Sequence, residues 1–498
     1  MRKRLLLFLI SLIVVSSGFS QPVQGVLVQN TNPYILKVWG NHYERGYAMG
    51  YLLGEQIADI YGNYVAPQFG SSLPMAKLMI QQGLFTIDSV FISEAHGVID
   101  GITDAGFNPG TMDYLDVLIG NTFLDFQNIS SYKNKIQSPG CSSLISWGNA
   151  TAASELGGKT IITRHLDWST ETCVLNNQAI IIHFPTDPGE QPWLLIGFAG
   201  QMGVLSGLNL SGLGVFQHSM SDSYSPGYST QHYEPVWFFL RRTLEQTDIN
   251  GDGVSNTLDM RAAALQNING FADGYIISAI APNTFSNDSL CAMIAELAPA
   301  APLHTFRDNS FPDSVPGSNI YAANYEIKRN NHLHFCYRYN QTKNALDAIS
   351  GQHIGKNVSW TIMADSSNAG FGNVQMIQYI PEDNELYVAF HPGDAAAYET
   401  TPVFFDLVSL FSPTAIPDVT TKPVSLFPNP ANDYLYISGD PDEEFTFYLY
   451  NLQGKELIQK TGLSGNGKIN ISRLKAGMYV VKLCSQHLNY SGRIVVEK

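Results

Sequence analysis

The sequence predicts an α+β protein with a mainly helical N-terminal part, a strand-dominated central domain and a small all-β domain at the C-terminus. Three observations lead to this prediction. Apolar residues recur at helical spacing after residue 40, strand-like runs dominate from Cys141 onward, and a proline-rich linker precedes residues 424–498. With 498 residues, of which 44% are hydrophobic and 14% charged, the chain is long enough for more than one globular domain.

Residues 1–20 predict a secretory signal peptide. A basic start at residues 1–4 precedes an apolar run from Leu5 to Val15 and then small residues. This run is shorter than the roughly 20 residues of a membrane span, so we expect cleavage after Ser20 and a soluble, exported protein. The formal net charge of −15 argues against nucleic acid as a partner.

Residues 21–140 are expected to be mainly helical. The stretch "VWGNHYERGYAMGYLLGEQIADIYGNYV" (38–65) changes from a strand-like to a helical pattern, and "AKLMIQQGLFTIDSVFISEAHGVIDGI" (76–102) continues it.

Residues 141–412 are expected to form the main domain, with strands outnumbering helices. Strand-like runs are "CSSLISW", "KTIITRHLDW", "QAIIIHF", "WLLIGFAG", "GLGVFQHSM", "GYIISAIA", "NIYAANYEI", "HLHFCYRY", "VQMIQYI" and "ELYVAFH". Helices are predicted at "PVWFFLRRTLEQ", "LDMRAAALQNI" and "NQTKNALDAIS".

The C-terminal residues 424–498 follow a linker, residues 413–423, and contain short strands that predict a small β-sandwich. The stretches "SLFPNPANDYLYI", "YLYNLQGKEL" and "INISRLKAGMYVVKL" resemble the type A sorting domain of type IX secretion cargo. The resemblance implies transport across the outer membrane by the type IX secretion machinery, with the protein then either released or attached to the surface. The alternative is a carbohydrate- or protein-binding sandwich.

Cys141, in "SPGCSSLISW" (138–147), is the candidate nucleophile. Five cysteines are too few for a disulfide framework, and their odd number leaves at least one free, although a bridge such as Cys173–Cys291 stays open. If residues 141–148 and 159–167 pair antiparallel, Arg164 and Asp167 come beside the thiol. A guanidinium stabilises a thiolate, and a carboxylate can hold a protonated amine. The alternatives are an inert buried cysteine and an ordinary Arg–Asp surface pair.

"GCSSLISW" followed by "TRHLDW" resembles the cholylglycine hydrolase and penicillin acyltransferase group of N-terminal-nucleophile (Ntn) hydrolases. "GNHYERGYAMGYLLGEQI" (40–57) resembles the prosegment signature of its acyl-CoA:6-aminopenicillanic acid acyltransferase-like branch, and "GLNLSGLGVFQHSM", "IYAANYEI" and "CYRYN" follow in the family's order. The resemblance covers about residues 35–410. It implies a four-layer αββα core and a precursor that cleaves itself between Gly140 and Cys141, after which chain 21–140 stays bound to the core.

The resemblance also assigns roles to five further residues. Arg164 matches the arginine that tunes the nucleophile and contacts substrate, and Asp167 matches the aspartate that binds the new α-amine. Asn324 matches a hydrogen-bond donor to the oxyanion, and Arg338 matches a late arginine that supports the cysteine. His218 stands where relatives carry asparagine, so it is either a donor or a packed strand residue.

The implied function is hydrolysis of linear amide C–N bonds of small N-acyl compounds through a thioester, without a catalytic cofactor. An amine acceptor in place of water would make the protein an acyltransferase. Specific hydrolysis of bile salts or N-acyl amino acids, and a catalytically silent surface protein that only binds, are the alternatives. The sequence does not define the acyl chain, the leaving amine or the oligomeric state.

The segment "DINGDGVSNTLD" (248–259) has the spacing of a calcium loop, with Gly253 at the sixth position. The predicted ligands of a structural calcium are Asp248, Asn250, Asp252, the carbonyl of Val254, Asn256 and Asp259. The alternative is a metal-free acidic turn. His332 and His334 alternate on one expected strand but have no third ligand nearby, which argues against zinc.

Overall fold

The computed structural model describes residues 22–127, 129, 140–220, 232–283, 290–308, 317–329, 337–350, 352–365, 370, 372–412 and 425–497, the last range without 429, 439–443, 452–454, 464–466 and 485–488. The predicted signal peptide, the linker and the pair His332 and His334 lie outside these residues. Among the described residues, no helix is both long and apolar enough to cross a membrane.

The N-terminal segment is not purely helical, because it begins with two strands. Its elements are β1 (Gly25–Gln29), β2 (Tyr34–Gly40), α1 (His42–Ile60), the π-helical turn η1 (Tyr61–Val65), α2 (Ala66–Phe69), η2 (Gly70–Ser72), α3 (Leu73–Gln81), α4 (Ser89–Asp104), α5 (Tyr114–Thr122) and η3 (Phe123–Phe126). A capping box between Asn41 and Glu44 starts α1. Glycines let α1 and α4 approach closely, since a Cβ at Gly46 would lie 2.1 Å from the carbonyl oxygen of Glu94.

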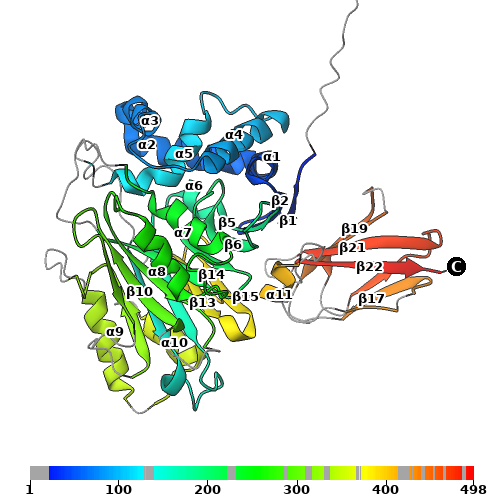
Figure 1. The fold of residues 1–498 in the computed structure, drawn as a ribbon. Coiled ribbons are helices and arrows are strands. Elements are labelled where there is room, and N and C mark those ends of the chain that lie inside the picture. The colour runs from blue at the N-terminus through cyan, green and yellow to red at the C-terminus, as the bar shows by residue number, and fades with distance from the viewer. Residues whose placement is uncertain are drawn as a thin grey trace, which may run out of the picture.

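Two sheets form the centre of the molecule (Figure 1). The larger has nine strands in the order β1-β2-β5-β6-β7-β8-β9-β10-β11, and the smaller has six in the order β12-β3-β4-β13-β14-β15. The strands are β3 (Gly140–Ser146), β4 (Ile161–Asp167), β5 (Gln178–Pro185), β6 (Trp193–Phe198), β7 (Ser206–Asn209), β8 (Gly214–Met220), β9 (Gly274–Ile280), β10 (Ala292–Leu297), β11 (His304–Arg307), β12 (Asn319–Ala322), β13 (Asn373–Ile380), β14 (Glu385–Phe390) and β15 (Val403–Asp406). Buried side chains of both sheets, such as Ile145 and Ile276, pack face to face in one cluster.

Helices cover the outer face of each sheet. The N-terminal helices pack on the nine-stranded sheet together with α6 (Thr172–Leu175), α7 (Val236–Glu245) and α8 (Thr257–Gln266). The six-stranded sheet is covered by α9 (Tyr337–Ala348) and α10 (Lys356–Ala364). The remaining short helical elements are η4 (Gly148–Ala150), η6 (Pro381–Asp383), η7 (Ala397–Glu399) and α11 (Leu407–Leu410). The order helix, sheet, sheet, helix confirms the predicted αββα layering.

The strand expected at "HLHFCYRY" is wrong where the structure describes it. Residues 337–339 begin α9, because the helix-favouring stretch that follows them extends back through this segment. The sequence also missed β7, β10, β11, β15 and α10.

The C-terminal segment forms two further sheets, as expected for a small sandwich, and is drawn in orange to red in Figure 1. Its strands are β16 (Ser425–Phe427), β17 (Tyr434–Ser438), β18 (Phe445–Tyr450), β19 (Glu456–Leu463), β20 (Lys468–Asn470), β21 (Gly477–Cys484) and β22 (Asn489–Val496). Leu435, Phe447 and Val481 lie in its own apolar core, separate from that of the main domain.

Candidate active site

The hairpin of β3 and β4 has the predicted antiparallel pairing. Gly140 lies opposite Asp167, Cys141 opposite Leu166 and Ser143 opposite Arg164. Since side chains alternate along a strand, Arg164 shares the face of Cys141, whereas Asp167 lies on the other face beside Gly140. Arg164 and Asp167 therefore approach the Gly140–Cys141 peptide from opposite faces of the sheet.

The thiol of Cys141 is fully buried beside the guanidinium of Arg164. The Nη2 atom of Arg164 lies 3.5 Å from Sγ and donates to the carbonyl oxygen of Gln217 at 3.0 Å. Burial raises the pKa of the Cys141 thiol above its usual 9.0, although Arg164, Arg338 and the backbone N–H of Ser219 favour the thiolate. The thiol is thus protonated at neutral pH.

The backbone nitrogen of Cys141 is held by Asn324. It donates to Oδ1 of Asn324 at 3.0 Å, and Nη1 of Arg338 donates to the same oxygen at 3.4 Å. The amide nitrogen of Asn324 donates to the carbonyl oxygen of Ser219. Residues far apart in the sequence therefore meet at one backbone position.

Gly140 lies directly against an ion pair between Arg338 and Asp167. A Cβ at residue 140 would lie 2.5 Å from Nη1 of Arg338 and 3.1 Å from Oδ2 of Asp167. Burial raises the pKa of Asp167 to about 6, while the neighbouring Arg338 opposes this shift. Asp167 is therefore ionised at neutral pH.

His218 does not lie with this group. Its Nε2 atom is 3.0 Å from the hydroxyl oxygens of both Ser143 and Ser278. Burial, aided by the charge of Arg164, lowers the pKa of His218 well below 6.5, so the ring is neutral. Its neighbour Ser219, which the sequence did not single out, lies at the thiol through its backbone.

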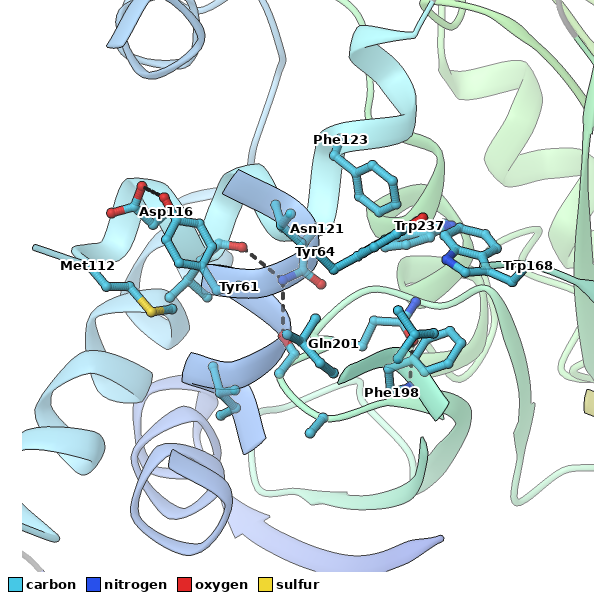
Figure 2. A pocket seen from close by; sticks show the side chains of 18 residues that line it. Tyr61, Tyr64, Met112, Asp116, Asn121, Phe123, Trp168, Phe198, Gln201 and Trp237 are labelled. Atoms are coloured by element: carbon cyan, nitrogen blue, oxygen red, sulfur yellow. Dashed lines mark hydrogen bonds between the residues drawn. The ribbon is translucent and has the colours of Figure 1, made fainter. Parts of the chain in front are cut away.

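An apolar pocket lies between the N-terminal helices and the nine-stranded sheet (Figure 2). It encloses about 570 Å³ of empty space, part of which is open to solvent. Aromatic side chains from both parts of the chain form its walls, namely Tyr61, Tyr64, Phe123, Trp168, Phe198 and Trp237. Trp168 directly follows Asp167, and Nε1 of Trp237 donates to the side chain of Gln217 at 3.2 Å. The pocket is therefore linked to the thiol through Gln217 and Arg164.

The predicted calcium loop is closed by its own backbone. Gly253 has the expected positive φ of 85°, and Asp248 accepts hydrogen bonds from the backbone N–H groups of Gly251, Asp252 and Gly253 at 2.7, 3.1 and 2.9 Å. Asp259, at the twelfth position, instead turns toward the backbone N–H groups of Ile249, Asn250 and Asn256, at 2.7, 3.3 and 2.8 Å. A cation would have to compete with these donors for Asp259, so calcium remains a prediction.

The Cys173–Cys291 bridge that the sequence left open is not formed.

The C-terminal segment matches a known domain. Residues 425–497 match the family model described as secretion system C-terminal sorting domain. This match confirms the interpretation of the tail as a sorting domain and implies interaction with the secretion machinery.

Comparisons with whole proteins give distant similarities. Protein dcd1B of Dictyostelium discoideum is 24% identical over 42% of this chain and 42% of its own length, so this chain spans less than half of that relative. Among solved structures, the chain is similar to a Caenorhabditis elegans orthologue of N-acylethanolamine-hydrolyzing acid amidase (12% identity, TM-score 0.34, 48% of this chain and 93% of that one). It is also similar to penicillin V acylase from Agrobacterium tumefaciens (12% identity, TM-score 0.34, 55% and 89% covered).

Proposed function

We propose that this protein is an exported, self-processing cysteine amidase of the Ntn-hydrolase type, which cleaves linear amide bonds of N-acyl compounds. One observation carries the proposal. Arg164, Asp167, Asn324 and Arg338, which come from three separate parts of the sequence, converge on the Gly140–Cys141 peptide. The resemblance assigns these same residues to the nucleophile.

Self-processing begins when the Cys141 sulfur adds to the carbonyl carbon of Gly140. The C–N bond then breaks, the nitrogen takes up a proton, and the acyl group of Gly140 is left on sulfur as a thioester. Water hydrolyses the thioester, which gives a carboxylate at Gly140 and restores the thiol. The absence of a side chain at Gly140 leaves room for this attack between Arg338 and Asp167.

Cleavage creates the base that the buried thiol needs. A free α-amine has a pKa of about 7.7–8.0, so at neutral pH a useful fraction can take the thiol proton. The Oδ1 atom of Asn324 already lies 3.0 Å from the backbone nitrogen of Cys141, which becomes the α-amine. The carboxylate of Asp167 lies beside Gly140, on the other side of the bond that breaks. Arg164 then stabilises the thiolate that attacks the substrate.

The tetrahedral intermediate needs hydrogen-bond donors for its oxygen. The backbone N–H of Ser219 and the amide of Asn324 are the nearest candidates, and losing one such donor typically costs about 10²–10³ in rate. In the uncleaved chain the Asn324 amide donates to Ser219, so its role requires this bond to open.

The apolar pocket supports an N-acyl substrate with an apolar acyl chain. Its walls are mainly aromatic and aliphatic, and Gln217 links it to Arg164. Water as the acceptor makes the reaction a hydrolysis. We favour this over acyl transfer because an exported enzyme works in excess water.

Intact mass and N-terminal sequencing of the purified protein test the proposal. We expect two chains, the second beginning at Cys141, and a Cys141→Ala variant that stays whole. Cys173→Ala is the matched control, because Cys173 is also a free, buried cysteine, and it should be cleaved like the wild type. An uncleaved wild-type chain without activity on N-acyl amides would contradict the proposal. It would favour the alternative of a catalytically silent binding protein.

A further inference from the structure

The space between the two sheets is largely apolar, but three polar side chains meet in it behind the thiol. Ser143 on β3, His218 on β8 and Ser278 on β9 are all fully buried. The two hydroxyl oxygens are 2.7 Å apart, and each lies 3.0 Å from Nε2 of His218. We call these three residues the inter-sheet clamp.

The clamp joins the strand of the thiol to the strand that contacts the thiol. Ser143 lies two residues after Cys141 on β3 and directly opposite Arg164. His218 lies between Gln217, which binds Arg164, and Ser219, whose backbone reaches the thiol. Strands β3 and β8 therefore carry Ser143 and His218 of the clamp as well as the thiol and its contact Ser219.

Directional hydrogen bonds can fix the position of β3 relative to β8, whereas apolar packing alone cannot. Apolar contacts such as those of Phe216 and Ile276 are non-directional and tolerate small shifts of one sheet over the other. A buried polar network favours one arrangement of its partners. The neutral ring of His218 takes part through Nε2 without a buried counter-charge, whereas its Nδ1 has no hydrogen-bond partner among the described residues.

We propose that His218 is a positioning residue, which with Ser143 and Ser278 fixes β3 against β8 and so holds Cys141 at Arg164 and Ser219. This inference rests on the proposed function, and it replaces a direct role of His218 as a donor to the oxyanion. It also adds Ser143 and Ser278, neither of which contacts the reacting atoms.

Substitutions that keep or remove the nitrogen at the Nε2 position test the clamp. The amide nitrogen of His218→Gln can take that place, whereas His218→Leu and Ser278→Ala break the network. For the latter two we expect kcat on an N-acyl amide to fall about tenfold or more with KM little changed, and His218→Gln to restore most of kcat. Ser206→Ala is the matched control, because Ser206 is buried in the same sheet and its hydroxyl has no hydrogen-bond partner among the described residues.

Two results would overturn the inference. In one, His218→Gln is as inactive as His218→Leu while Ser278→Ala keeps wild-type kcat. This result would mean that the imidazole ring of His218 takes part directly in the reaction. In the other, crystal structures of wild type and Ser278→Ala show the same contact between Arg164 and Gln217, 3.0 Å here. The crystallographic result decides the positioning role even if the wild type proves uncleaved and inactive, so it separates failure of the clamp from failure of the proposed function.

Discussion

A buried ionic network should make retention of the N-terminal segment depend on pH. His42 on α1 lies 2.8 Å from Glu94 of α4 and 3.0 Å from Glu190 of the β5–β6 connection. On α7, Glu245 lies 4.0 Å from His42, and Nη2 of Arg241 lies 3.1 Å from Nδ1 of the ring.

Most ion pairs of this network cross between the two chains that cleavage would produce. Glu94 pairs with Arg241 at 2.6 Å, and Arg45 pairs with Glu190 at 3.1 Å and with Glu245 at 2.7 Å. Two pairs do not cross: Arg241 with Glu245 within α7, and His42 with Glu94 within the N-terminal segment. His42, Glu190 and Glu245 lie close enough to suggest a metal site, but guanidinium groups already occupy both carboxylates.

The charge balance depends on the proton of His42. Glu94, Glu190 and Glu245 face the guanidiniums of Arg45 and Arg241, and Asp187 lies at the edge, 3.9 Å from Arg45. An imidazolium at residue 42 offsets part of the excess negative charge, which a neutral ring leaves uncompensated. Burial by itself lowers the pKa of His42, but its hydrogen bonds to Glu190 and Glu94 outweigh burial and raise it above 6.5. The stabilisation is therefore complete below the unfolded pKa of about 6.5 and is lost as the pH rises through the raised folded pKa.

His42→Gln tests this reasoning. Removing one partner of a buried ion pair typically costs about 3–5 kcal/mol, so the variant should lose roughly that much unfolding free energy at pH 5.5. At pH 9 the variant should lose less, because the wild-type ring is then neutral and the wild type's own stability has fallen. Urea unfolding followed by tryptophan fluorescence measures both, with the exposed His96→Gln as control. Equal destabilisation by His42→Gln at both pH values would refute the reasoning.

Three other predictions concern the cleavage site, the pocket and the loop. Gly140→Ala should slow self-cleavage about tenfold or more, because its Cβ displaces Arg338 by more than a small adjustment, and time-resolved gel analysis of the refolding precursor measures this. Gly120→Leu should add a side chain to the pocket, since a Cβ at Gly120 would meet no atom within 4 Å, and move preference to shorter acyl chains in a chain-length series, whereas Gly62→Leu, outside the pocket, should leave the preference unchanged. Calcium at a hundredfold excess over Kd should stabilise the protein by about 2.7 kcal/mol in thermal unfolding, and Asp248→Asn should abolish this; no shift means a metal-free loop.

The sequence was sufficient to predict the hairpin of β3 and β4, because both strands have strong β patterns and a single turn region separates them. Strand alternation then separates Arg164 from Asp167, which lie three residues apart and so face opposite ways. The sequence predicted that both approach the thiol, whereas the structure places Arg164 at the sulfur and Asp167 beside Gly140.

The other features of the site depend on long-range packing, which cannot be predicted from the patterns of a single sequence. His218 and Ser219 are adjacent, and only the stacking of the two sheets decides which of them faces the thiol. The parallel pairing of β2 with β5 joins residues far apart in the chain, and no local sequence pattern predicts it. The pocket likewise takes its walls from several separate segments.

These long-range contacts bear on what cleavage would accomplish. The segment 21–140 supplies two strands of the nine-stranded sheet and part of the pocket wall, so its loss would expose the sheet edge and open the pocket. Lys37 of β2 also donates to the carbonyl oxygens of Ser409 and Ser412, at 3.2 and 2.6 Å, at the far end of the core. Under the proposed function, breaking the Gly140–Cys141 bond would therefore change the chemistry of one residue while both chains keep their places. The proposed cut would then activate the amidase without releasing a propeptide.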